Sequence, residues 1–139
     1  MILGSPCGAG AEPAPRGADV GDHWHARYQI VFCGWVLQPL PGSPGATHTH
    51  GDGKIHVHPG SREEAGPHAN LGAFFRSASA RLTPSSLELP GWVPMRNGDQ
   101  CPDHRVGRWR LWVNGRVEPA MDRYLLQDGD EIRLEFAPE

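Results

Sequence analysis

The sequence has almost no lysine, few methionines and cysteines, and no long apolar run. Lys54 is the only lysine, the arginines are scattered along the chain, and the formal net charge is −3 with a pI near 6.2. A nucleic-acid-binding domain usually carries a basic cluster, so we expect no nucleic-acid partner. A membrane-spanning helix needs about 20 apolar residues in succession, so we expect no membrane span.

Several familiar functional motifs are also missing. The sequence contains no Ser-His-Asp arrangement, phosphate-binding loop or dinucleotide fingerprint. It finishes with Phe136-Ala137-Pro138-Glu139 rather than the Gly-Gly of sulfur-carrier and ubiquitin-like modifiers. We therefore expect neither nucleotide chemistry of these kinds nor a role as a modifier.

Residues 1–21 lack the charged start and apolar middle of a signal peptide, and they are rich in Ala, Gly and Pro. We expect a disordered arm over 1–21 and a single domain over 22–139, which is long enough for one core. The compartment stays open: cytoplasmic, unless an export signal or anchor preceded these residues and was removed.

The three cysteines allow different roles. Cys7 lies in the arm and is expected to be free. Cys33 and Cys101 have three possible roles, as a disulfide, as soft metal ligands or as inert residues, and for a buried Cys33 a small hydrophobic role is favoured.

Histidine is the residue type that the sequence concentrates most. Residues 47–59 read T-H-T-H-G-D-G-K-I-H-V-H-P, with two His-x-His pairs on either side of a Gly-Asp-Gly turn. Alternate side chains of a strand share one face, so each pair projects both imidazoles the same way. The four histidines are His48, His50, His56 and His58.

Whether the two histidine pairs share one face of the hairpin depends on whether the loop between them has an odd or an even number of residues. With a three-residue loop Gly51-Asp52-Gly53, His48 lies opposite His56 and all four imidazoles share one face. A two-residue Asp52-Gly53 turn would divide them between the two faces. Three-residue loops commonly place Gly in the left-handed conformation, and Gly53 fits that role, so we predict the three-residue loop and a preorganised metal site.

Another His-x-His, His23 and His25, begins the first predicted strand. If this strand pairs antiparallel with 54–58, either residue can complete a site with His56 and His58. Neutral imidazoles suit Zn, Cu, Ni or Fe, and the scarcity of methionine favours Zn, Fe or Cu(II) over Cu(I). Asp22 and Asp52 are candidate ligands or partners of the imidazoles, although Asp52 is first of all a turn former.

The alternative is an exposed cluster that captures metal only adventitiously. His68 and His104 are expected to be solvated. We expect the tryptophans to be core or site-wall residues, namely Trp24, Trp35, Trp109 and Trp112.

Periodicity predicts an α+β fold. Strands are expected over 23–37, 54–58, 86–89, 108–113 and 131–136, with one helix within 67–80. Asn70 is the predicted helix cap, and Asn114-Gly115 predicts a hairpin. This order of strands around one helix is that of a β-grasp domain, with a mixed or antiparallel sheet and one packed helix.

Two segments carry family resemblances. From Trp109 onward, W-R-L-W-V-N-G and Y-L-L-Q-D-G-D-E-I-R-L-E-F resemble the C-terminal half of transcobalamin-like β-grasp domains. Residues 22–28, 48–59 and 69–75 resemble an uncharacterised family of small bacterial proteins with a D-H-W-H-A and H-x-H-G-D-G-x-I-H-x-H-P signature. The second resemblance supports the idea of a site without naming its chemistry, and it implies a membrane anchor ahead of D-H-W-H in many members, which we do not expect in this sequence.

Three functions are compatible with these patterns. The first is a transition-metal-binding protein. The second is a small mononuclear metalloenzyme, redox, oxygenase or hydrolytic, with one metal position open to a small-molecule substrate. The third is a metal-independent protein-interaction module that uses a sheet edge. The sequence does not settle whether the chain is an enzyme, nor its oligomeric state.

Overall fold

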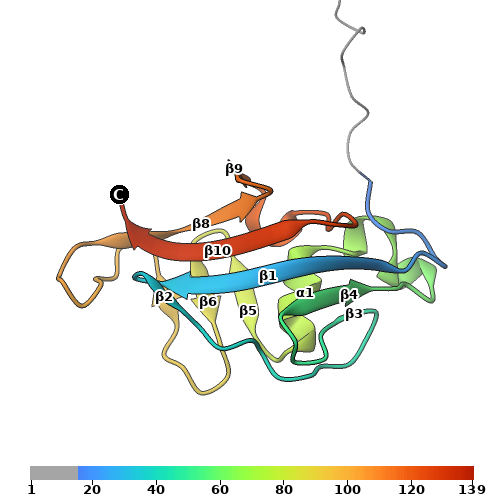
Figure 1. Ribbon diagram of the computed structural model, residues 1–139, viewed down its shortest axis with the longest axis horizontal. Coiled ribbons are helices and arrows are strands. Elements are labelled where there is room, and N and C mark those ends of the chain that lie inside the picture. The colour runs from blue at the N-terminus through green and yellow to red at the C-terminus, as the bar shows by residue number, and fades with distance from the viewer. Residues whose placement is uncertain (1–15) are drawn as a thin grey trace, which may run out of the picture.

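The computed structural model describes residues 16–139, and its centre is a pair of long parallel strands. Figure 1 shows these strands, β1 (Trp24–Phe32) and β10 (Glu131–Pro138), side by side across the molecule. β4 (Lys54–Val57) pairs antiparallel with the first half of β1, and β8 (Gly107–Val113) pairs antiparallel with β10. The sheet order is β3-β4-β1-β10-β8-β9, and β2 also pairs with β1. The added short strands are β2 (Trp35–Val36), β3 (Thr47–His48) and β9 (Arg116–Val117).

One face of this sheet is covered by a helix and a second, smaller sheet. The helix α1 (Leu71–Ser77) begins after Asn70, whose side chain accepts a hydrogen bond from Ala73 N, so the predicted cap is confirmed. The 3-10 turns η2 (Arg62–Glu64) and η3 (Gly66–His68) precede the helix, and η4 (Met121–Arg123) packs against it. The smaller sheet contains β5 (Arg81–Thr83), β6 (Ser86–Glu88) and β7 (Met95–Arg96). The fold is therefore α+β, as predicted.

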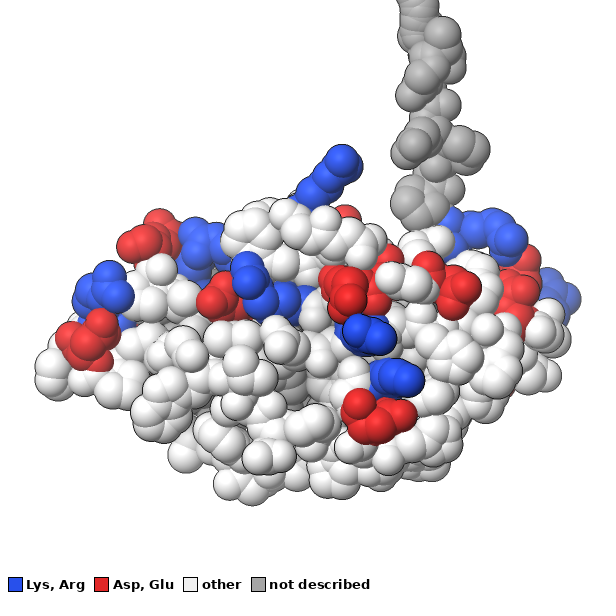
Figure 2. Space-filling view, in the orientation of Figure 1, with Lys and Arg blue, Asp and Glu red and all other residues white. Residues whose placement is uncertain are grey.

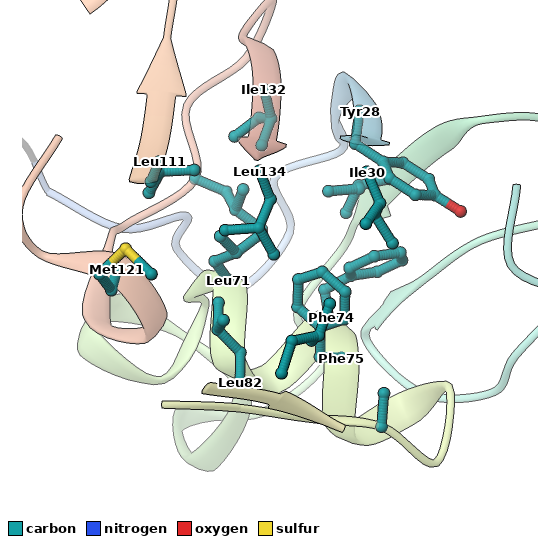
Figure 3. Packing of buried hydrophobic residues seen from close by; sticks show 14 of the residues in the cluster. Tyr28, Ile30, Leu71, Phe74, Phe75, Leu82, Leu111, Met121, Ile132 and Leu134 are labelled. Atoms are coloured by element: carbon teal, nitrogen blue, oxygen red, sulfur yellow. The ribbon is translucent and has the colours of Figure 1, made fainter. Parts of the chain in front are cut away.

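The core lies between the main sheet and α1. Figure 3 shows side chains of β1, β8 and β10 pointing toward Phe74, Phe75 and Leu71 of the helix. Burial alternates along β10, where Ile132 and Leu134 are buried while Glu131 and Arg133 are exposed. Because alternate residues of a strand face opposite sides, the apolar side chains of each strand lie against the helix and the polar side chains lie on the other face of the sheet.

The end of the first predicted strand is different from the prediction. The strand was expected to continue to Leu37, but the chain turns back at Cys33 and Gly34, and Trp35 pairs with Phe32. Cys33 has φ 51° and Gly34 φ 86°, and two successive left-handed residues cannot continue a strand.

Cys33 also forms a disulfide with Cys101, with the two Cα atoms 5.8 Å apart. The favoured expectation for Cys33, a small inert hydrophobic residue, is thus wrong. The bond ties the turn after β1 to the loop that precedes β8, across a sequence separation of 68 residues.

Several other features differ from the expectation or extend it. Residues 16–21, which were expected to belong to the disordered arm, contact the domain: Ala18 is fully buried, and Gln127 Nε2 donates to Arg16 O at 2.8 Å.

Cys7 lies outside the described residues. Within 16–139, no helix has the length and apolarity to span a membrane.

The turn before β10 is held by a buried carboxylate. Asp130 is 4% exposed and accepts hydrogen bonds from the Tyr124 hydroxyl at 2.7 Å, from Gln127 N at 2.9 Å and from Asn114 Nδ2 at 3.1 Å. Burial, together with the hydrogen bond to Asp130, raises the pKa of Tyr124 well above its ordinary value. Asn114 also belongs to the predicted Asn114-Gly115 hairpin, which joins β8 to β9 and is confirmed.

Charged side chains are interspersed on the surface. Figure 2 shows Lys and Arg alternating with Asp and Glu along the upper half of this view, whereas the lower half is largely uncharged. The ion pairs of the described residues include Arg108–Glu139 and Arg110–Glu139.

Candidate metal centre

Three strands bring histidines into one row across the sheet. His56 of β4 lies opposite His48 of β3 on one side and opposite His25 of β1 on the other. Their neighbours Ala26, Ile55 and Val57 are buried in the core, so the histidines occupy the face of the sheet opposite α1. The predicted opposition of His48 and His56 is confirmed.

Three further histidines, which lie just outside the strands, contact this row. His23 follows the row at ring-centroid distances of 4.8 Å from His25 and 5.2 Å from His58. His58 in turn lies 4.7 Å from His48, and His50 lies 4.8 Å from His48 and 4.5 Å from His56. Six imidazoles therefore form one contiguous surface, which we call the histidine cluster: His23, His25, His48, His50, His56 and His58.

The loop between β3 and β4 covers residues 49–53 and is longer than the three-residue loop predicted, but its odd length keeps the predicted register. Gly51 and Gly53 have φ 80° and 77°, so both adopt the left-handed conformation that glycine tolerates. Between them, Asp52 Oδ1 accepts a hydrogen bond from Lys54 N at 3.1 Å, which makes Asp52 a turn former. This turn holds β3 and β4 in the register that places their histidines on one face.

Three members of the cluster can hold a metal ion together. One ring nitrogen from each of His23, His25 and His56 lies within 4.8 Å of the other two. His23 and His25 are exposed, whereas the His56 side chain is only 15% exposed. His56 Nε2 is buried and has no hydrogen-bond partner among residues 16–139, where the nearest carboxylate oxygen, Asp52 Oδ2, is 3.9 Å away. A buried nitrogen without a partner is unusual, and a metal ion would satisfy it.

His48 is oriented by the backbone. Its Nδ1 lies 2.8 Å from the carbonyl oxygen of Gly45, and since a carbonyl only accepts, Nδ1 carries the hydrogen. In the neutral ring this leaves the lone pair on Nε2, which lies 3.2 Å from His50 Nε2. A hydrogen bond from Nδ1 to a carbonyl is the arrangement that fixes the tautomer of metal-binding histidines.

The environment favours neutral imidazoles at the two less exposed positions. Burial lowers the pKa of His48, and it outweighs the opposing effect of the Gly45 hydrogen bond. Burial likewise lowers the pKa of His56, with the neighbouring His25 and His50 acting in the same direction. Neutral imidazole is the form that binds metal ions.

The other candidates lie elsewhere. Asp22 Oδ2 accepts from Asp19 N at 2.9 Å and closes a local turn before β1. His68 and His104 are exposed and make none of the ring contacts of the cluster. Cys33 and Cys101 are engaged in their disulfide, so neither offers a thiolate to a metal.

The tryptophans divide between the core and the surface. Trp109 is 4% exposed and donates from Nε1 to Met95 O at 2.9 Å, and Trp24 packs against the core. Trp112 is half-buried under the Arg133 guanidinium, 5.1 Å from the ring centroid. The expected core or wall role is wrong for Trp35, which is 72% exposed because the chain turns back before it.

Trp35 contributes to an apolar surface away from the histidines. Together with Trp92 it borders two adjoining hollows of about 820 and 570 Å³. Val36 and Val93, next to these two residues in sequence, are also largely exposed. Trp92 was not among the residues expected at a functional surface. Its position between Pro90-Gly91 and Pro94 could have indicated an exposed loop, since proline and glycine favour loops.

Three strands and the residues next to their ends thus bring six imidazoles together, and three of these can hold a metal ion. Comparison of the chain with protein-family models, with curated proteins and with solved structures gave no match.

Proposed function

We propose that this protein binds a transition-metal ion through the histidine cluster, with His23, His25 and His56 as the principal ligands. The observation that carries the proposal is the convergence of these three ligand atoms within 4.8 Å, combined with the unpartnered Nε2 of His56. His25 and His56 lie in paired strands and His23 directly precedes β1, so little ordering of the backbone is needed when the ion binds.

The donor set limits the choice of ion. Imidazole suits Zn, Cu and Fe, whereas Mg and Ca prefer oxygen ligands. Methionine sulfur, a ligand of Cu(I), is absent from the cluster, which favours Zn, Fe or Cu(II). Three neutral imidazoles leave the charge of the ion uncompensated, as in catalytic zinc sites where solvent takes a further position.

The test is elemental analysis of untagged, full-length protein purified without a nickel column and without added metal. We expect a single kind of metal to be present at about one equivalent or more, and we expect His23→Ala/His25→Ala to hold about one equivalent less. The matched control removes two histidines outside the cluster, His68→Ala and His104→Asn; Asn suits position 104, where φ is 68°. Metal content that is unchanged in both variants would refute the ligand assignment.

A chain that folds without metal and binds none on dialysis against Zn²⁺, Cu²⁺ or Fe²⁺ would refute the proposal as a whole. That outcome would favour the interaction module. The exposed Trp35 and Val36 would then be the first surface to test.

Exposure of two ligands favours a metalloenzyme as the second candidate. His23 and His25 are open to solvent, so an ion bound there would keep a position accessible to water or a small substrate. The metal would supply Lewis-acid or redox chemistry. Asp52, with Oδ2 3.9 Å from His56 Nε2, is the nearest carboxylate that could accept a proton. Turnover of a model ester or of superoxide by the metal-loaded chain, lost in Asp52→Asn with metal retained, would support this candidate.

We also infer a β-grasp topology. The support is the order of elements: an antiparallel pair β1–β4, then α1, then β8 and β10, with β10 inserted parallel to β1 at the centre of the sheet. The resemblance to transcobalamin-like domains and the resemblance to the D-H-W-H-A family remain proposals. Metal measurements on a second chain with the same signature would test the latter.

The disulfide bears on the compartment. Disulfides form and persist in oxidising surroundings and are rare where glutathione keeps thiols reduced. The Cys33–Cys101 bond therefore favours an extracytoplasmic or otherwise oxidising location over the cytoplasm. Thiol labelling of the protein in intact cells tests this inference, since a reduced pair in the native host would contradict it.

A further inference from the structure

We propose that the histidine cluster has a second metal position, at His48 and His50, beside the one formed by His23, His25 and His56. This inference rests on the proposed metal-binding function and adds to it the number of ions and the ligands of the second. The cluster would then hold a pair of ions rather than one.

The spacing of two nitrogen atoms supports the second position. His48 Nε2 and His50 Nε2 lie 3.2 Å apart. Two imidazole nitrogens bound to one tetrahedral zinc at about 2.0–2.1 Å are separated by about 3.3 Å. The pair therefore has the separation that a shared ion requires.

The orientation of His48 supports the same conclusion. The carbonyl of Gly45 fixes its Nδ1 as the protonated nitrogen, so the Nε2 lone pair is directed at His50. In the metal-free protein, His50 must present its own Nε2–H as a donor to that lone pair. When the hydrogen of His50 moves to its own Nδ1, an ion can take its place and bind both Nε2 atoms without any change in the backbone that positions His48.

The two positions are separate but adjacent. His56 lies between them, with ring centroids 4.7 Å from His25, 5.3 Å from His48 and 4.5 Å from His50. His58 completes the other side, 5.2 Å from His23 and 4.7 Å from His48. The pair His48–His50 therefore draws on ligands that the first position does not use, and His58 is available to either ion.

Charge defines what must accompany the ions. Two divalent ions would be surrounded by neutral imidazoles, and Asp52 is the nearest carboxylate, 44% exposed. Two ions in such proximity repel unless an anion lies between or beside them. Hydroxide or chloride from solvent supplies that charge, and the exposed rings of His23, His25, His50 and His58 leave solvent free to enter.

The experiment is a Cu²⁺ titration of untagged, disulfide-intact, full-length protein, followed by native mass spectrometry and electron paramagnetic resonance. We expect two equivalents to bind. The second equivalent should broaden or diminish the resonance of the first, because neighbouring Cu²⁺ ions couple magnetically. Two equivalents with no magnetic interaction would overturn the adjacent position.

Variants assign each equivalent. His48→Ala/His50→Ala should bind one equivalent, with the uncoupled resonance; His23→Ala/His25→Ala should also bind one; His68→Ala/His104→Asn should bind two. Because His48 is buried, His50→Ala alone serves as a second variant at an exposed position, and it should weaken the second equivalent at least about tenfold.

The possible failures are distinguishable. No bound copper would refute both the proposed function and the second position. A single equivalent in the unaltered protein would refute the second position and leave the proposed function standing. Two coupled equivalents that persist in both His48→Ala/His50→Ala and His50→Ala would refute the assignment to these residues.

Discussion

His25 and His56 lie directly opposite one another on β1 and β4, with their ring centroids 4.7 Å apart and their planes nearly perpendicular. Both belong to regular strands whose other faces carry core residues. The distance between the two imidazoles is therefore fixed by backbone pairing, and a metal site built on them is as rigid as the sheet itself.

Replacement of His56 tests the centre of the cluster. We expect His56→Ala to lose stoichiometric metal, because His56 adjoins both His25 and His48. In the metal-free state its unfolding free energy should change by less than about 1 kcal/mol, since the substitution removes a buried nitrogen that has no partner. Metal analysis and urea unfolding check the two expectations, with His68→Ala as the control. Full metal content in His56→Ala would contradict the first.

Metal should also stabilise the fold. An ion that binds only the folded state adds about 2.7 kcal/mol when its free concentration is 100 times its Kd. We expect the midpoint of thermal unfolding to rise with added Zn²⁺ and to return to its starting value with a chelator. His23→Ala/His25→Ala should lose the part of this rise that the first ion contributes, and an equal rise in that variant would place that ion elsewhere.

Because the pKa of Tyr124 is raised in the folded protein, we expect the protein to lose stability at alkaline pH. This pKa is raised above the ordinary value of 10.0 in the folded protein, so above about pH 10 the unfolded chain loses a proton that the folded protein keeps. Stability from this group is complete below pH 10 and falls as the pH rises further. Tyr124→Phe should remove this part of the pH dependence, and at neutral pH should lower the unfolding free energy by about 2 kcal/mol, since the hydrogen bond to the Asp130 carboxylate is lost.

Chemical denaturation at several pH values measures both effects of Tyr124. The Tyr28→Phe variant serves as a comparison with Tyr124→Phe. Burial raises the pKa of Tyr28 as well, but its hydroxyl accepts a hydrogen bond from Leu40 N at 2.7 Å. A Tyr124→Phe variant whose stability falls above pH 10 as steeply as that of the unaltered protein would contradict the assignment.

Reduction of the disulfide should destabilise the domain. The bond closes a loop with a sequence separation of 68 residues, for which the chain-entropy model gives about 4 kcal/mol. Thermal unfolding with and without a reductant, or of Cys33→Ser/Cys101→Ser, measures the change. Because Cys33 follows the end of β1 and His25 lies near its start, metal stoichiometry below the unfolding temperature should be unchanged. A loss of metal from a variant that is still folded would contradict the expectation that metal binding does not depend on the disulfide.

The turn of the histidine hairpin requires glycine. Gly53 has φ 77°, where a Cβ is strained, so Gly53→Ala should lower stability by about 1–2 kcal/mol. Gly42→Ala is the matched control, because its φ is ordinary and an added Cβ would meet only backbone atoms at 3.7 Å or more. Equal effects of the two substitutions would show that the conformation of Gly53 is not limiting.

Much of the site could be predicted because it depends on local rules. The parity of the Gly51-Asp52-Gly53 turn and the alternation of strand side chains are sufficient to bring His48 opposite His56. The cap at Asn70 follows from a side chain that satisfies a helix end.

Other features depend on irregular segments or on contacts between distant segments, and they could not be predicted in the same way. The carbonyl of Gly45 accepts from His48 Nδ1 only three residues away, but the 37–46 connection is irregular and has no periodicity to interpret. The disulfide requires the turn after β1 to meet the loop before β8, and spacing along the sequence gives no sign of that meeting.

The central parallel pairing of β1 with β10 has a consequence for the order of assembly. The backbone of His25 donates to Asp128 Oδ1, 103 positions later, and accepts from Gly129 N, so its strand is held by the segment that leads into β10. On the ribosome, the histidine hairpin emerges long before the strand that fixes its neighbour. Contacts so distant in sequence make folding slow, and the metal-binding surface would be completed only when the last strand enters the sheet.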